Sequence, residues 1–132
     1  MTFTTALVLY GALTLAMVGF GIFYTYATQG FGFGFSSNRG EVTYSKFAIR
    51  MKRTFQNHIE AGGYGVPILT AAAVLDLQGT GVHIAAMLFV IGRGAFVLLY
   101  YTGVPFIRVP AFLMATLSIF YITYHLAVSA WV

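Results

Sequence analysis

Apolar residues fall into long runs along this chain, as in helices that cross a lipid bilayer. The first run, 3–27, contains no charged residue, and a helix needs about 20 apolar residues to span the hydrocarbon core. Two more runs follow at 82–101 and 108–131. Each is long enough for one membrane-spanning helix, so the pattern predicts three spans from these segments alone.

A fourth helix is predicted at 45–77, beginning at Tyr44 or Ser45, and its two halves differ. Its second half is apolar, with a kink expected near Pro67. At about 1.5 Å per residue the helix is roughly 50 Å long, whereas the hydrocarbon core is about 30 Å thick. We therefore expect it to tilt, or to project from the membrane at its charged end. The charged residues of its first half are Lys46, Arg50, Lys52, Arg53 and Glu60.

The segments between these helices read as loops. Segment 28–43 contains glycine and phenylalanine in alternation at 30–35, and repeated glycine disfavours a regular helix. We expect a flexible loop there whose phenylalanines enter the lipid headgroups. Shorter turns are predicted at 76–81 and 102–107. The chain is thus expected to be all-α, an integral membrane four-helix bundle forming a single domain over residues 1–132.

Composition and charge support this interpretation and give it an orientation. The chain is 59% hydrophobic and 8% charged, against about 25% charged residues in soluble domains. The net charge of +4 lies at helix ends, which indicates membrane orientation rather than nucleic-acid binding. Basic residues cluster in the first loop and around the third, and the second has none. The positive-inside rule then places loops one and three in the cytoplasm and both termini on the opposite side.

Polar residues in the second helix form a stripe. Arg53, Asn57 and Glu60 are spaced by four and three residues, so they share one helical face. An ionised group at the bilayer centre costs about 2.5–3.5 kcal/mol, so the stripe is expected to face protein or a wet cavity. Arg93, in the third helix, is the second intramembrane charge. Its predicted partner is Glu60, through an ion pair.

Several polar side chains are expected to meet at the cytoplasmic interface in a cationic pocket for a small polyanion. Arginine suits such a pocket because its planar fork is always charged. Lys46, Lys52 and Arg39 are instead interpreted as topology-setting charges. The three histidines lack metal-ligand spacing, so no metal site is expected, and the chain has no cysteine of its own. The pocket residues are Arg50, Arg53, Asn57, Tyr101 and Arg108, with Tyr100 nearby on the face of Arg93.

Two segments resemble signatures of the MAPEG family, the membrane-associated proteins in eicosanoid and glutathione metabolism. Segment 53–60, RTFQNHIE, resembles the R-x3-N-x2-E signature of the family's second helix. Segment 92–108, GRGAFVLLYYTGVPFIR, resembles its run from an arginine to tyrosines, followed by a turn and a further arginine. The chain length and the four-span layout also agree with the family. Within it, the chain resembles a bacterial-type member similar to microsomal glutathione transferases.

The resemblance implies a homotrimer that binds glutathione between neighbouring subunits on the cytoplasmic side. It assigns Arg53, Asn57, Glu60 and Arg93 to glutathione binding, together with either Tyr100 or Tyr101. It assigns Arg108 to stabilising the glutathione thiolate, with Arg39 and Arg50 as assisting residues. Glutathione would supply the thiol that this cysteine-free chain lacks.

The implied reaction is conjugation of glutathione to an apolar electrophile from the membrane, or reduction of a lipid hydroperoxide, in a bacterial cell membrane. Two alternatives remain. One is a non-catalytic lipid-binding or scaffold protein of the same fold. The other is a small four-span transporter, which is less favoured because the first helix contains no ionisable group.

Overall fold

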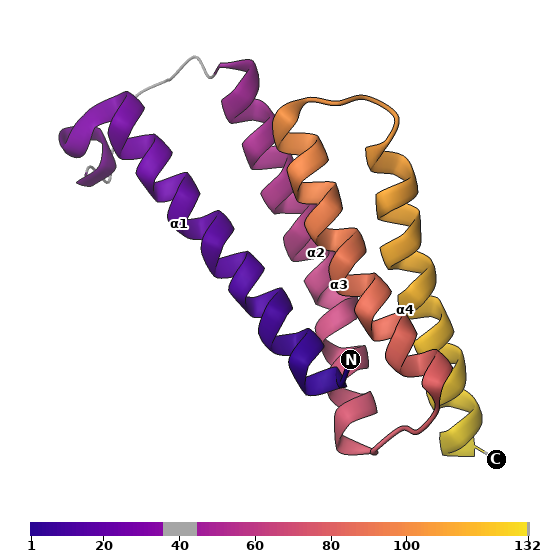
Figure 1. Ribbon diagram of the computed structural model, residues 1–132. Coiled ribbons are helices and arrows are strands. Elements are labelled where there is room, and N and C mark those ends of the chain that lie inside the picture. The colour runs from indigo at the N-terminus through magenta and orange to yellow at the C-terminus, as the bar shows by residue number, and fades with distance from the viewer. Residues whose placement is uncertain (36–44, 132) are drawn as a thin grey trace.

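Four helices in antiparallel succession make up the chain (Figure 1). The structure, a computed structural model, describes residues 1–35 and 45–131. The helices are α1 (Phe3–Phe35), α2 (Lys46–Val74), α3 (Thr80–Thr102) and α4 (Arg108–Trp131). The described residues contain no strand. The predicted all-α four-helix bundle is confirmed.

Three of these helices are apolar and long enough to cross a membrane on their own. They provide the segments Phe3–Gly32, Thr80–Thr102 and Arg108–Ser129. Among the described helices α2 alone fails this criterion, because its first half carries the charges. It nevertheless runs beside α3 and α4 through the same layer (Figure 1). The chain is an integral membrane protein in which apolar helices accompany a more polar one.

The end of α1 differs from the prediction of a loop from residue 28. The helix continues to Phe35, with a single break at Gly30, where φ is 82° and ψ is 169°. Only glycine adopts this conformation readily, so the chain changes direction there and then resumes a helical course. Phe31, just beyond the break, is 69% exposed and packs against the ring of Tyr26. Residues 36–44, including Arg39, lie outside the described part.

The ends of α2 follow from local chemistry. Ser45 caps the helix by accepting a hydrogen bond from the backbone amide of Ala48 at 3.2 Å, as the predicted start requires. The helix ends at Val74, three residues before the predicted end, because Asp76 adopts a left-handed φ of 49°. Pro67 lies within the helix, which continues through it. The kink predicted at this position stays a prediction.

Helices α3 and α4 are joined by a tight turn and pack closely. Gly103 ends α3 with φ 76°, a common glycine position after a helix. At Gly92, a Cβ atom would lie 2.9 Å from the carbonyl oxygen of Ala111 and 2.9 Å from the amide nitrogen of Ala115. Only a residue without a side chain permits the two helices to approach this closely.

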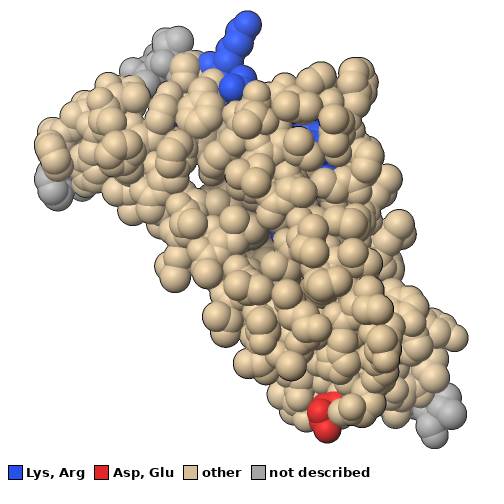
Figure 2. Space-filling view, viewed as in Figure 1, with Lys and Arg blue, Asp and Glu red and all other residues tan. Residues whose placement is uncertain are grey.

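The apolar core lies at one end of the bundle, away from most of the basic residues. It joins the start of α1 and α3 to the later halves of α2 and α4, around fully buried residues such as Leu69, Phe89 and Ile122. Toward the other end α1 diverges from the remaining helices (Figure 1). Basic side chains gather at this diverging end, on the face shown in Figure 2, and acidic atoms lie at the core end. Packing therefore holds one end of the bundle closed and leaves the charged end open.

Replacing Gly92 should weaken the α3–α4 contact. We expect Gly92→Ala to destabilise the protein by about 1–3 kcal/mol, because the new methyl group meets rigid backbone atoms. Gly94→Ala is the matched control, since a Cβ there has no neighbour within 4 Å. Thermal unfolding of the detergent-solubilised protein should show a lower midpoint for the first variant alone. Equal midpoints would contradict the close approach.

Candidate functional site

A polar pocket of about 490 Å³ lies on the outer face of α2, toward the charged end of the bundle. Its volume is within the range of about 300–1,000 Å³ found for small-molecule sites. The pocket has cationic, anionic, amide and phenolic groups within one concave surface. The residues that line it are Lys52, Arg53, Gln56, Asn57 and Glu60 from α2 and Tyr100 from α3.

Most of the predicted stripe lines this pocket. Arg53, Asn57 and Glu60 do so because their spacing turns them to one side of α2. Tyr100 contributes from the facing end of α3. Arg108, at the start of α4, places its guanidinium carbon 4.4 Å from the centre of the Tyr100 ring. The positive charge of Arg108 thus lies beside the pocket, against the Tyr100 ring that forms part of its wall.

The predicted ion pair between Glu60 and Arg93 is not formed. Arg93 is 1% exposed and donates a hydrogen bond from Nη1 to Oδ1 of Asn57 at 2.9 Å. Glu60 is exposed and accepts a hydrogen bond from Gln56 at 3.1 Å. The half-buried Asn57 reaches inward to the arginine, whereas the carboxylate stays on the outer side of the helix. A neutral amide, rather than a carboxylate, therefore meets the buried cation.

This hydrogen bond fixes the direction of the Asn57 side chain. A guanidinium can only donate, so the amide oxygen must face Arg93 and its NH₂ group is left to donate elsewhere. Arg93 itself does not line the pocket. Its Nε and Nη2 have no hydrogen-bond partner among the described residues, and its guanidinium lies 4.7 Å from the centre of the Phe96 ring. Arg93 is accordingly a positioning residue for Asn57.

Two other predicted residues lie away from the pocket. Arg50 packs beside Gly103, where a Cβ atom would lie 3.3 Å from its guanidinium carbon. Tyr101 turns to a different side of α3 from Tyr100 and lies between α1 and α2. Its ring centre is 5.7 Å from that of Phe20 and 6.0 Å from that of Phe47. The structure thus separates the two tyrosines that the sequence left as alternatives.

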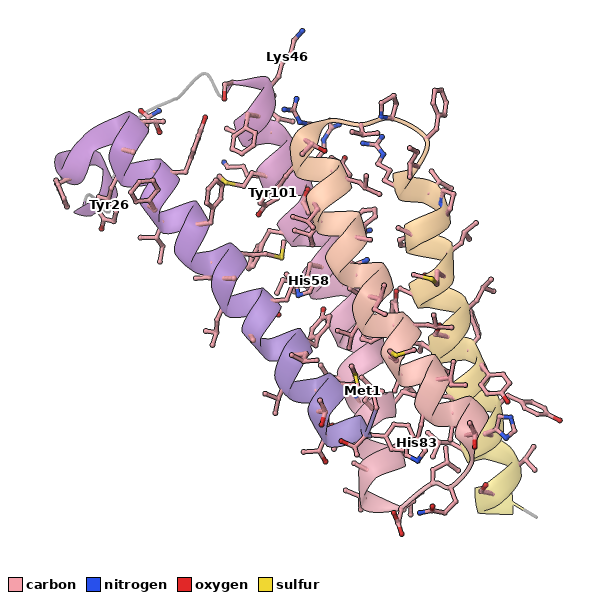
Figure 3. All side chains as sticks on the ribbon, viewed as in Figure 1. Met1, Tyr26, Lys46, His58, His83 and Tyr101 are labelled. Atoms are coloured by element: carbon pink, nitrogen blue, oxygen red, sulfur yellow. The ribbon has the colours of Figure 1, made fainter. Side chains whose placement is uncertain are left out.

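His58, which the sequence gave little weight, is fully buried between α1 and α2 (Figure 3). Its ring stacks on Tyr10 with centroids 4.2 Å apart, and its Nε2 lies 2.7 Å from the hydroxyl of Thr14. That hydroxyl gives its single proton to the carbonyl of Tyr10, so Nε2 is the donor toward Thr14. The hydroxyl of Tyr10 donates in turn to the backbone carbonyl of His58. These contacts bind α1 to α2 at mid-bundle.

Sequence reasoning missed two residues of the polar pocket, Lys52 and Gln56. The sequence predicts Lys52 only as a topology-setting charge, and it predicts no role for Gln56. Lys52 and Gln56 are four residues apart, and they directly precede Arg53 and Asn57. This spacing is the sequence signal that places both on the same broad face of α2. Among the described residues no group of three or more histidine, aspartate or glutamate side chains is placed to hold a metal ion.

Removing the hydroxyl of Thr14 should loosen α1. In Thr14→Val, His58 keeps a buried ring N–H without an acceptor, which costs about 1–3 kcal/mol. Thr28→Val is the matched control, because among the described residues that exposed hydroxyl bonds only to the carbonyl of Tyr24 in its own helix. Thermal unfolding in detergent should show a lower midpoint for Thr14→Val. A midpoint equal to that of Thr28→Val would contradict the link through His58.

Comparison with known proteins gives one match. The family model described as MAPEG family matches residues 3–128 of the 132-residue chain. Neither the comparison with curated proteins nor the comparison with solved structures returned a match.

Proposed function

Since this chain belongs to the MAPEG family, we propose that it is a membrane enzyme that binds glutathione in the polar pocket of α2 and activates its thiol. The observation that carries the proposal is the set of charges in that pocket. The apolar electrophile or lipid hydroperoxide that reacts with the thiolate would arrive from the bilayer.

The pocket matches glutathione group by group. Glutathione carries two carboxylates, one ammonium group and a thiol. Lys52 and Arg53 supply cations for the carboxylates, and Glu60 supplies an anion for the ammonium group. Asn57 presents its NH₂ group as a further donor because Arg93 holds its oxygen. Because the pocket has both positive and negative side chains, it fits this zwitterionic peptide better than it fits a simple anion.

Thiol activation is assigned to Arg108. A free cysteine thiol has a pKa of about 8.5, and the thiolate is the nucleophile. A nearby guanidinium favours the charged form and so lowers the thiol pKa. In conjugation the sulfur forms a bond to an electrophilic carbon, and the electron pair leaves with the displaced group. In the peroxidase reaction two glutathione molecules are oxidised to the disulfide, and the hydroperoxide is reduced to an alcohol and water.

The oligomeric state is proposed to be a homotrimer. In one protomer the polar pocket is open, and Lys52, Arg53 and Glu60 are exposed side chains of a membrane protein. Ionised groups are costly against hydrocarbon, so a neighbouring copy of the chain would cover this face and complete the site. We place the site on the cytoplasmic side by the positive-inside rule.

Calorimetric titration of the detergent-solubilised protein with glutathione tests the binding site. We expect Arg53→Ala to weaken binding by roughly ten- to a hundredfold, because a charge-assisted hydrogen bond contributes about 1.5–3 kcal/mol. Lys46→Ala removes an exposed cation of the same helix outside the pocket and should bind like the wild type. Absence of binding, together with tight retention of lipid, would favour the non-catalytic lipid-binding protein instead.

The role of Arg108 is tested by the near-ultraviolet absorbance of the bound thiolate. Arg108→Ala should abolish this absorbance at neutral pH, and it should reappear only at higher pH, since the lost cation no longer lowers the thiol pKa. Gel filtration should show an unchanged assembly. Thiolate absorbance equal to that of the wild type would remove Arg108 from this role.

A further inference from the structure

A buried tyrosine of α1 contacts the backbone of α2 directly beside the polar pocket. Tyr10 is 5% exposed and belongs to the apolar core. Its hydroxyl donates a hydrogen bond to the backbone carbonyl of His58, the residue that follows Asn57. Asn57 and Glu60 line the pocket on the outer face of α2, whereas His58 lies between α1 and α2 (Figure 3). The tyrosine therefore reaches the same stretch of α2 from its inner side.

The hydroxyl of Tyr10 lies against one turn of α2, from His58 to Gly62. In an α-helix the carbonyl of residue 58 accepts a hydrogen bond from the amide of residue 62. A carbonyl oxygen has two lone pairs, so the tyrosine is a second donor to the same acceptor. A Cβ atom at Gly62 would lie 2.9 Å from the Tyr10 hydroxyl oxygen, so glycine leaves the space that the hydroxyl occupies. The contacted turn contains Glu60 and begins beside Asn57.

Packing around the Tyr10 ring fixes the position of this hydroxyl. The ring stacks on the imidazole of His58, with centroids 4.2 Å apart, and on Phe89 of α3, with centroids 5.5 Å apart. The backbone carbonyl of Tyr10 accepts a hydrogen bond from Thr14, whose hydroxyl lies 2.7 Å from Nε2 of His58. Side chains of three helices thus hold the tyrosine, and the turn of α2 cannot move without breaking these contacts.

The contact lies at the junction between the two halves of α2. The pocket residues, 52–60, come before it, and beyond it the helix enters the apolar core at Leu69. Gly62 and Gly63 are adjacent at the junction, and glycine weakens a helix interior. A Cβ atom at Gly63 would meet nothing within 4 Å, so packing does not require glycine there. The helix is thus intrinsically weak at the turn that Tyr10 supports.

We propose that Tyr10 is a positioning residue for the polar pocket, because its hydroxyl holds the turn of α2 that carries ligand-binding side chains. The inference rests on the proposed function, since the ligand concerned is glutathione. Asn57 must keep its oxygen on Arg93 to present its NH₂ group, and Glu60 must face the ammonium group of the same ligand. A displacement of this turn changes both directions at once. Tyr10 does not line the pocket, so it acts through these residues.

Tyr10→Phe tests this role because it removes the hydroxyl and keeps the ring. Calorimetric titration of the detergent-solubilised protein should show glutathione binding weakened by about three- to tenfold, the size expected for one lost hydrogen bond. Thiolate absorbance at saturating glutathione should equal that of the wild type, because Arg108 belongs to α4. Tyr121→Phe is the matched control. Its hydroxyl also lies against a glycine, Gly81, at the start of α3, and this variant should bind like the wild type.

Hydrogen exchange tests the same contact without a ligand. Peptides that cover residues 57–62 should exchange at least about threefold faster in Tyr10→Phe, because the turn opens more often. Tyr121→Phe should leave their exchange unchanged.

A second pair of variants approaches the contact from α2. Gly62→Ala should also weaken glutathione binding, because its methyl group meets the Tyr10 hydroxyl, whereas Gly63→Ala adds a methyl group in open space and should bind like the wild type. Since Gly62→Ala and Tyr10→Phe disturb one contact, their combination should lose less binding than the sum of the two single losses.

Three results would overturn the inference. Glutathione binding by Tyr10→Phe equal to that of the wild type would show that the hydroxyl only stabilises the fold. An equal loss in Tyr121→Phe would indicate a general loosening of the bundle. Unchanged exchange of residues 57–62 in Tyr10→Phe would show that the hydroxyl does not hold this turn. Absence of glutathione binding by the wild type would instead overturn the proposed function, and the exchange measurement does not depend on that binding.

Discussion

A bilayer offers ionised side chains no partner, and the placement of α2 follows from this constraint. Its first half carries half of the chain's charged residues, so it is the helix that depends most on neighbours. On its inner side Asn57 meets Arg93 and His58 meets Thr14. On its outer side the charges line a pocket that needs a ligand, water or another protomer. The three apolar helices provide the surroundings in which such a helix can cross the membrane.

The position of the apolar core determines which end of the bundle holds all four helices together. Apolar residues join all four helices at one end, around Leu69, Phe89 and Ile122. At the other end α1 separates from the remaining helices, and it is linked to α2 and α3 by the aromatic contacts of Phe20, Phe47 and Tyr101. The polar pocket and a second cavity, between α1 and α2, lie on the sides of α2 in this separated half.

The sequence was sufficient to predict the helices, because run length and charge decide which segments enter a membrane. The residues of α4 were predicted at 108–131 as observed, and Ser45 was identified as a start of α2. The continuation of α1 past residue 27 was not predicted, because glycine content alone does not show that one residue, Gly30, takes the whole change of direction. Local composition gives the average helix propensity of a segment, whereas a break in a helix depends on the φ and ψ angles of one residue.

The candidate site was predictable as a helical face but not as a set of contacts. Spacing placed Arg53, Asn57 and Glu60 together, and the structure agrees on that surface. Spacing does not determine which member turns inward, so it assigned Arg93 to Glu60 although Asn57 is its partner. The position of His58 was unpredictable for a similar reason. Its surroundings come from α1, whose crossing angle no pattern in α2 determines.

Tyr100 and Tyr101 give α3 a role beyond supporting the other helices. Successive residues of a helix point about 100° apart, so Tyr100 lines the polar pocket while Tyr101 lines a cavity between α1 and α2. Both rings belong to the last turn of α3, and Gly103 ends the helix two residues later. A movement of this last turn would therefore displace both rings. The walls of the polar pocket and of the cavity between α1 and α2 thus include adjacent residues of one helical turn.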